Sequence, residues 1–230
     1  MLSQQVSTGQ TGRAPQPGAQ LSVTDLFTIG IGPSSSHTVG PMRAAASFAV
    51  LAALHGTPIN LHCELFGSLA LTGKGHATDT AVMLGLSGWL PEEIAPEEVA
   101  DIIANIGKTE TLLLGGRKPI AFHEADIAFR TGEFLPGHPN ALRFTARYAG
   151  GREIVQTYFS IGGGAIVAEG QEQQRSNISP RYPISSAAEL LATGRQTGLS
   201  IAAIGWANEE AWRPRAETVA FIDSVHHAML

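Results

Sequence analysis

The chain has 230 residues, of which 43% are hydrophobic and 15% are charged. This composition excludes a disordered chain, a coiled coil and a collagen-like repeat, and the length allows one large or two small globular domains. Because 20 acidic residues outnumber 15 basic ones, the formal net charge is −5. We therefore expect neither nucleic acid nor an anionic membrane as a partner.

The cysteine content limits the chemistry of the chain. Cys63 is its only cysteine, which excludes a disulfide framework, a cysteine-rich zinc site and a cysteine-ligated iron–sulfur cluster within this one chain. Chemistry that needs several thiolates must therefore come from another domain or subunit.

The first 20 residues are rich in Gln, Ser, Thr, Gly and Pro and contain no apolar segment typical of a signal peptide. We expect residues 1–20 to form a disordered leader. The most apolar stretch, residues 44–54, is shorter than the roughly 18 residues that a membrane span needs. These patterns favour a cytoplasmic protein.

Residues 21–230 alternate between short apolar runs and helical patterns, which indicates one α/β (α+β) domain with a mixed sheet and helices packed on it. Pro41 stands where a first helical residue is expected, and Gly56 where that helix ends. Thr78 or Asp79 is expected to cap a second helix. Helices are predicted over 41–55, 78–86, 96–106, 185–192, 200–212 and 215–229, and strands over 59–66, 111–114, 125–130, 142–148 and 154–160.

Two glycine features interrupt the strand pattern. Gly150 and Gly151 predict a hairpin turn between the last two strands. The run from Ile161 to Val167 contains three consecutive glycines, which permit a β-bulge or a close approach of the backbone.

The first candidate site is the segment 30–41, which reads GIGPSSSHTVGP and leads directly into a helix. Backbone N–H groups, the helix dipole and the hydroxyls of Ser34, Ser35, Ser36 and Thr38 favour binding of a carboxylate or a phosphate there. An ordinary helix cap is the alternative interpretation. The segment lacks the Lys-Ser/Thr of a P-loop and does not match the Gly-x-Ser-x-Gly nucleophile elbow.

Two further polar segments contain candidate residues. In segment 67–79, glycines flank Lys74, and His76 lies just before a predicted helix, although lysines and histidines in loops are commonly solvated surface. In segment 135–140, a glycine and two prolines hold His138, as a general acid or base would require, although a plain surface turn is the alternative. The histidines interpreted as structural or exposed are His55, His62, His123, His226 and His227.

Taken together, several segments closely resemble one family, the iron–sulfur-dependent L-serine dehydratases, also called L-serine deaminases. The resemblance rests on DLF at 25–27, IGIGPSSSHTVGPM at 29–42, GSL at 67–69, LTGKGH at 71–76 and YFSIGGG at 158–164. The likeness runs from about Leu21 onward, and the part that matches is the amino-terminal β domain of the family.

The resemblance implies a lyase of amino-acid degradation and gluconeogenesis that converts L-serine to pyruvate and ammonia with a 4Fe–4S cluster. In the family, cysteines of a following α domain hold this cluster, so the resemblance implies that this chain alone binds no metal and acts with an α domain or subunit. It also implies a fold similar to the allosteric substrate-binding domain of certain phosphoglycerate dehydrogenases. We further expect a homo-oligomer.

The resemblance implies that iron polarises the β-hydroxyl of bound serine while a base removes the α-proton. The groups expected to bind the substrate carboxylate are Ser34, Ser35, Ser36 and Thr38, with Lys74 as possible added charge. The acid–base candidates are His37, His138 and, third, His76, and spacing does not decide which of them takes the proton.

Two alternatives remain open. The chain could be a non-catalytic regulatory domain that binds a small molecule or an anion. A serine hydrolase is the weaker alternative, because Ser36 and His37 are sequence neighbours, which seldom reach the hydrogen-bond geometry of a relay, and because no acidic partner is evident.

Overall fold

The computed structural model describes residues 22–171 and 178–230. The expected leader, residues 1–20, therefore lies outside the described residues. The described residues form two compact units. The larger unit contains residues 25–171 and 224–230, and the smaller unit contains residues 22–24 and 178–223. The predicted domain boundaries stay a prediction.

The larger unit is built on a five-stranded mixed sheet. Its order is β4–β1–β5–β6–β7, in which β1 runs parallel to β4 and the other neighbours are antiparallel. The strands are β1 (Asn60–Gly67), β4 (Ile127–Arg130), β5 (Asn140–Arg147), β6 (Glu153–Gly162) and β7 (Ala165–Ala168). A separate two-stranded sheet consists of β2 (Thr111–Leu114) and β3 (Lys118–Ala121).

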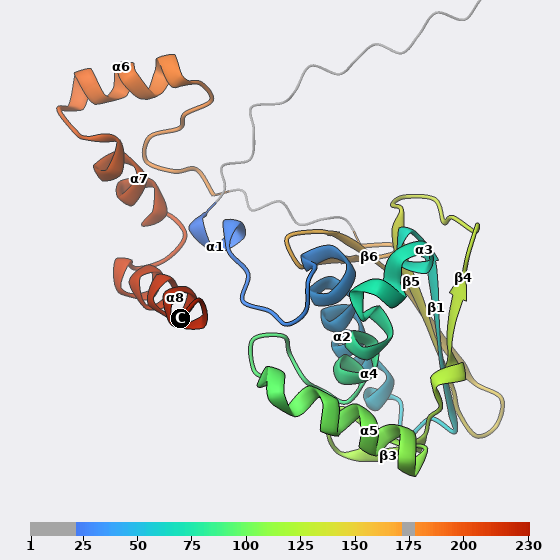
Figure 1. The fold of residues 1–230 in the computed structure, drawn as a ribbon. Helices are drawn as coiled ribbons and strands as arrows, with labels where there is room; N and C mark the ends of the chain where they lie inside the picture. Colours follow the sequence, from blue (N-terminus) through green and yellow to red (C-terminus); the bar gives the residue numbers. More distant parts are fainter. Residues whose placement is uncertain (1–21, 172–177) are drawn as a thin grey trace, which may run out of the picture. The chain divides into compact units, whose positions relative to one another are not determined.

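Helices pack on one face of the main sheet, as Figure 1 shows for α2 (Gly40–Leu54) and α4 (Thr78–Leu86). The aromatic ring of Phe48 in α2 stacks on Phe144 in β5 with centroids 5.0 Å apart, and both side chains are fully buried. Cys63 lies in the same core, in β1, with no exposed surface. The predicted mixed sheet with packed helices is confirmed, and the similarity to a phosphoglycerate dehydrogenase domain stays a prediction.

Close packing between α2 and α4 depends on a glycine. A Cβ atom at Gly85 would lie 2.1 Å from the carbonyl oxygen of Met42, so only glycine lets the two helices approach this closely. Another helix of this unit is α5 (Val99–Thr109), which follows a 3₁₀ turn over Pro96–Glu98. Of its residues, Ile106 is buried, and Ile102 and Ile103 pack against the core.

Most of the predicted elements are present with boundaries that differ by a few residues. The turn at Gly150 and Gly151 is confirmed, with φ angles of 83° and 82°, and the predicted bulge is present as a register shift between Ser160 and Gly162. The elements not predicted are β3, β7, α1 (Val23–Leu26), α3 (Ser68–Thr72), a π-helical turn over Ser35–Val39 and 3₁₀ turns over Gly73–His76 and Glu124–Asp126. The last of these replaces the predicted start of the strand at residue 125.

The prediction that Thr78 or Asp79 caps α4 is wrong. The helix begins at Thr78, and the cap position is Ala77, which has the left-handed angles φ 52° and ψ 39° and offers no side-chain hydrogen bond. Thr78 instead donates its hydroxyl hydrogen to the backbone carbonyl of His37 at 2.6 Å. The Thr78 hydroxyl therefore forms a long-range hydrogen bond to His37 instead of capping its own helix.

The smaller unit contains α6 (Ala187–Thr197), α7 (Ile201–Glu209) and the first part of α8 (Arg215–Ala228). Ser186 and Ser200 cap the first two helices, because their side chains accept hydrogen bonds from the backbone N–H groups of Glu189 and Ala203. Gly198 ends α6 with φ 70°. The three helices predicted in this part of the chain are confirmed.

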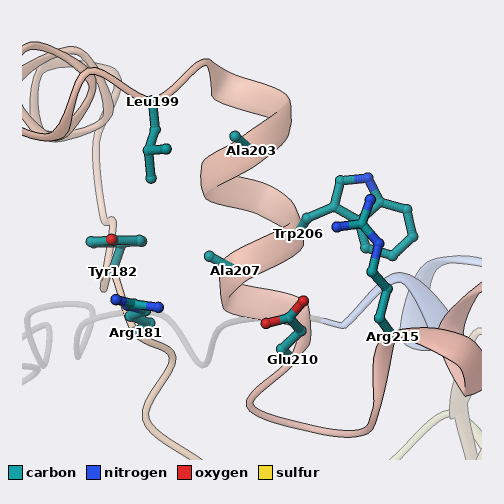
Figure 2. Close-up of a pocket in the computed structure, with 8 residues that line it drawn as sticks. All are labelled: Arg181, Tyr182, Leu199, Ala203, Trp206, Ala207, Glu210 and Arg215. Carbon is teal, nitrogen blue, oxygen red and sulfur yellow. The ribbon is translucent and has the colours of Figure 1, made fainter.

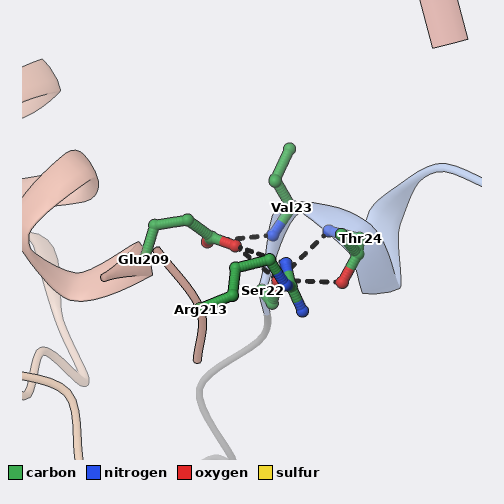
Figure 3. Close-up of polar contacts among 5 residues, drawn as sticks. All are labelled: Ser22, Val23, Thr24, Glu209 and Arg213. Carbon is green, nitrogen blue, oxygen red and sulfur yellow. Dashed lines mark hydrogen bonds and ion pairs between the residues drawn. The ribbon is translucent and has the colours of Figure 1, made fainter. Parts of the chain in front are cut away.

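A polar cluster ties residue 22 to the end of α7 in the smaller unit (Figure 3). The carboxylate of Glu209 accepts hydrogen bonds from the hydroxyl of Ser22 at 2.5 Å and from the backbone N–H of Val23 at 3.1 Å. Arg213 donates to both Ser22 Oγ and Glu209 Oε1, at 2.8 and 3.0 Å. Ser22 and Glu209 are buried, so the cluster satisfies groups that would otherwise lack water.

Within residues 22–171 and 178–230, no helix combines the length and the apolar character that a membrane crossing requires.

Candidate functional site

The first candidate segment contains one turn of π-helix, over Ser35–Val39, that continues into α2. The side chain of Ser34 caps this turn by accepting a hydrogen bond from the backbone N–H of His37 at 3.1 Å. The capping role left open by the sequence is therefore present at Ser34. Single π-helical turns are frequent at functional sites, and the backbone N–H groups of the first turn have no helical acceptor.

All four polar atoms of His37 have a hydrogen-bond partner. Its backbone N–H donates to Ser34 Oγ, and its carbonyl accepts from Thr78 Oγ1. Its ring lies between two hydroxyls, with Nδ1 2.9 Å from Ser36 Oγ and Nε2 2.9 Å from Ser68 Oγ. The imidazole is therefore held in one place by its backbone and by both ring nitrogens.

Partial burial, and second the neighbouring His76, lower the pKa of His37 below its ordinary value of 6.5. The two rings lie with their centroids 4.9 Å apart at an angle of 38°. Because the pKa is lowered, the imidazole of His37 is neutral at pH 7 and can accept a proton.

Backbone contacts decide which nitrogen of His76 carries the hydrogen. Its Nδ1 lies 2.9 Å from the carbonyl oxygen of Thr72, and a carbonyl only accepts, so Nδ1 is the protonated nitrogen. In the neutral ring, Nε2 then keeps its lone pair. The backbone carbonyl of His76 also accepts the buried hydroxyl of Thr38 at 2.8 Å, so Thr38 holds the two candidate segments together.

His138 has the opposite arrangement. Its Nδ1 accepts the backbone N–H of Asn140 at 3.1 Å, so the neutral ring carries its hydrogen on Nε2 and can donate it. The next residue, Pro139, accepts the backbone N–H of Ser68 at 2.9 Å with its carbonyl. The structure thus joins the turn that carries His138 to Ser68, whose hydroxyl contacts His37.

Three residues that build this site were not among the candidates predicted from the sequence. Besides Ser68, Ser160 of β6 donates its hydroxyl hydrogen to the backbone carbonyl of Ser36 at 2.8 Å. Asn140 of β5 donates from Nδ2 to the carbonyl of Ser160 at 3.4 Å. For Ser68 and Ser160, the available signal is their place within GSL at 67–69 and YFSIGGG at 158–164, two of the segments on which the family resemblance rests.

Lys74 is held by two carboxylates. Its Nζ lies 2.6 Å from both Asp79 Oδ2 and Glu124 Oε1 and 5.2 Å from the ring centroid of Phe129. These hydrogen bonds, with Asp79 first, raise the pKa of Lys74, so its ammonium group is charged but already paired. The predicted role of Lys74 as added positive charge stays a prediction. Among the serines predicted to bind the carboxylate, Ser35 is exposed to solvent.

The expectation that Ser36 and His37, as sequence neighbours, do not reach hydrogen-bond geometry is wrong. Ser36 and His37, although adjacent, lie in hydrogen-bond contact at 2.9 Å, because their side chains can meet in the π-helical turn. The ring has hydroxyl groups on both nitrogens, so it lacks the carboxylate that orients the histidine of a hydrolase triad.

The donor set of the described residues does not fit an iron–sulfur cluster or another metal site. Within the described ranges, no group of three or more His, Cys, Asp or Glu side chains could hold a metal ion. Cys63, the one thiol of the sequence, is completely buried in β1. Burial and the nearby Glu64 also raise its pKa well above the ordinary value, which disfavours the thiolate that a metal needs.

Two pockets in the structure are lined by residues outside the candidate site. One, of about 490 Å³, lies beside α7 and is shown in Figure 2. The other, of about 630 Å³, lies beside α5 and is lined in part by Trp89, Ile102 and Leu113. None of the site residues predicted from the sequence lines either hollow.

Comparisons with known proteins agree with the predicted family. Residues 22–171 match the family described as serine dehydratase beta chain. The chain is 42% identical over 220 residues to an L-serine dehydratase of Mycobacterium tuberculosis (strain CDC 1551 / Oshkosh) and 38% identical over 219 residues to L-serine dehydratase 1 of Escherichia coli (strain K12). Each alignment covers 91% of this chain and 47% of the relative. The chain thus spans about half the length of the curated relatives that it matches.

Proposed function

This chain belongs to the serine dehydratase beta chain family, and from that premise we propose that it supplies the β-domain part of the active site of an L-serine ammonia-lyase. The reaction converts L-serine to pyruvate and ammonia. The observation that carries the proposal is the placement of His37, in the family's SSSHT segment, between the hydroxyls of Ser36 and Ser68 and beside His76.

The chemistry requires an anion site and proton carriers. Dehydration removes the α-proton and the β-hydroxyl of serine as water, and the resulting aminoacrylate tautomerises and takes up water to give pyruvate and ammonia. The π-helical turn before α2 supports carboxylate binding, because it combines N-terminal N–H groups with the exposed Ser35 and the hydroxyls of Ser34 and Ser36.

The tautomers support a division of roles among the histidines. His37 is neutral and His76 keeps a lone pair on Nε2, so both suit the base that removes the α-proton. His138 carries hydrogen on Nε2 and suits the donor that protonates the departing hydroxyl. We place His37 first as the base, because its ring is held at both nitrogens.

The 4Fe–4S cluster implied by the family resemblance would be held outside this chain, because the donor set described above does not fit it. We propose an α domain or subunit of the same enzyme as the holder of that cluster. The shares of the alignments support this, since about half of each relative lies beyond the part matched by this chain. Assembly into a homo-oligomer belongs to the same proposal.

The test is turnover of L-serine by the complete enzyme, measured as pyruvate formation. His37→Ala is expected to lower kcat by about 100-fold or more, the usual contribution of a general base. His55→Ala, which changes an exposed histidine at the end of α2, is the matched control and should stay within about twofold of the parent. Parent-like turnover of His37→Ala would remove His37 from the chemistry.

A regulatory, anion-binding role is the second candidate function, favoured by the hollow beside α7. Figure 2 shows Arg181 and Arg215 at this hollow, with Glu210 between them in the view. The guanidinium of Arg215 lies 4.3 Å from the ring centroid of Trp206. Calorimetry of L-serine with the chain, with and without Arg215→Ala, separates the candidates, because only a site in this hollow loses affinity in the variant.

A further inference from the structure

Ser68 is held rigidly by its own backbone. It is the first residue of α3, its N–H donates to the carbonyl of Pro139 at 2.9 Å, and its carbonyl accepts from Thr72 Oγ1 at 3.0 Å. The preceding Gly67 has φ 57° and ψ −126°, and a Cβ atom there would lie 2.1 Å from the Pro139 carbonyl oxygen. The Ser68 hydroxyl is therefore placed by a glycine turn and by two backbone hydrogen bonds.

The other partner of the His37 ring is Ser36. Ser34 Oγ accepts the backbone N–H of His37 and lies 3.5 Å from Ser36 Oγ, a contact in which either hydroxyl can be the donor. When Ser34 donates in this contact, the hydrogen of Ser36 is available to His37 Nδ1 at 2.9 Å. In that arrangement Nδ1 accepts, so the ring hydrogen stands on Nε2 and is donated to Ser68 Oγ.

His37 differs in this respect from the two other candidate histidines. Backbone groups fix the tautomers of His76 and His138, whereas both ring contacts of His37 are to hydroxyls, which can donate or accept. The tautomer of His37 therefore depends on which hydroxyl is held as an acceptor. The backbone of Ser68 is held at both its N–H and its carbonyl.

We propose that Ser68 is a positioning residue that keeps the hydrogen of His37 on Nε2, so that the lone pair on Nδ1 faces the serine-rich turn over Ser34–Ser36. This inference rests on the proposed function, because that turn is the place assigned to the substrate carboxylate. A base with its lone pair on the carboxylate side of the site is oriented toward the α-carbon, one bond from the carboxylate.

The direct test is nitrogen NMR of the chain with ¹⁵N-labelled histidine. In the parent, His37 is expected mainly as the Nε2–H tautomer. Ser68→Ala removes the acceptor and is expected to give a mixture of both tautomers, whereas Ser68→Thr keeps the hydroxyl and restores the parent signal. Ser47→Ala, which changes an exposed serine of α2, is the matched control. An unchanged His37 spectrum in Ser68→Ala overturns the proposal.

Turnover of the complete enzyme adds a second readout. Ser68→Ala is expected to lower kcat roughly tenfold, a part of the whole contribution of a general base, with KM changed less than twofold and activity recovered in Ser68→Thr. Equal loss in the Ala and Thr variants with a parent-like spectrum would show a structural role only and overturn the proposal. Failure of the proposed function is distinguishable, because it shows in His37→Ala turnover and leaves the tautomer measurement unaffected.

Discussion

The hydroxyl of Thr78 donates a 2.6 Å hydrogen bond to the backbone carbonyl of His37, and this contact joins the first turn of α4 to the π-helical turn before α2. Thr78 is completely buried. The carbonyl of His37 thus has a hydroxyl partner contributed by a different helix. The position of the candidate base consequently depends on a residue 41 positions away in the sequence.

Thr78→Val tests this dependence. The variant keeps the shape of the side chain but leaves the His37 carbonyl without this donor, so we expect a loss of about 1–3 kcal/mol in the free energy of unfolding. Urea unfolding followed by circular dichroism measures it. Thr109→Val is the control, because Thr109 makes exposed hydrogen bonds at the end of α5; an equal loss in both variants would contradict the special role of Thr78.

The glycines around Ser68 give a second prediction. Gly67→Ala should destabilise the chain by about 1–3 kcal/mol, because alanine cannot easily adopt its backbone angles and its Cβ would meet Pro139. Gly75→Ala is the matched control in the same segment, since a Cβ there meets nothing within 4 Å. Thermal unfolding of both variants is the measurement, and similar midpoints for the two would refute the assignment of strain to Gly67.

The lowered pKa of His37 predicts a pH dependence. Because the folded chain binds a proton at His37 less readily than the unfolded chain does, the stabilisation is complete above the ordinary pKa of 6.5 and is lost as the pH falls below it toward the folded-state pKa. His37→Gln should flatten this part of the stability profile. Denaturant unfolding at several pH values from about 5 to 8 checks it, and parallel profiles of parent and variant would contradict it.

The cluster in Figure 3 predicts a large effect in the smaller unit. Glu209→Ala removes the acceptor of Ser22, Val23 and Arg213 and leaves a partly buried guanidinium without its carboxylate, so we expect a loss of about 3 kcal/mol in stability of this unit. Hydrogen exchange at the Val23 amide reports it locally. Glu210→Ala is the neighbouring control, because Glu210 is exposed, and comparable exchange in both variants would count against the cluster.

Local signals in the sequence predicted much of the fold. Pro41 marks the start of α2 and the glycine pair at 150–151 forms its turn, because each of these signals depends on neighbouring residues alone. The strand β2 also occupies the predicted residues 111–114. The four-residue strands β3 and β7 were not predicted, and each of them is paired with the strand that precedes it in the chain. The apparent capping signal at Thr78 misled, because a distant carbonyl competes for its hydroxyl.

The candidate site, like the fold, was only partly predictable from local signals in the sequence. The segments that contain His37, His76 and His138 stand out by composition. The contacts that assemble the site around His37, however, join residues 31, 38 and 124 positions apart, as in His37–Ser68, Thr38–His76 and Ser36–Ser160. No spacing rule reaches across such separations. Ser68 and Ser160 therefore become visible only once the sheet and α2 are assembled.

The burial of Cys63 gives the chain a built-in reporter of its own unfolding. A thiol with no exposed surface and a raised pKa should resist alkylation by iodoacetamide as long as the core is closed. Because the sequence contains no second cysteine, every alkylated molecule reports an opening of the core around β1. Mass spectrometry of labelled variants would therefore rank the substitutions above by how often they open that core, without any added probe.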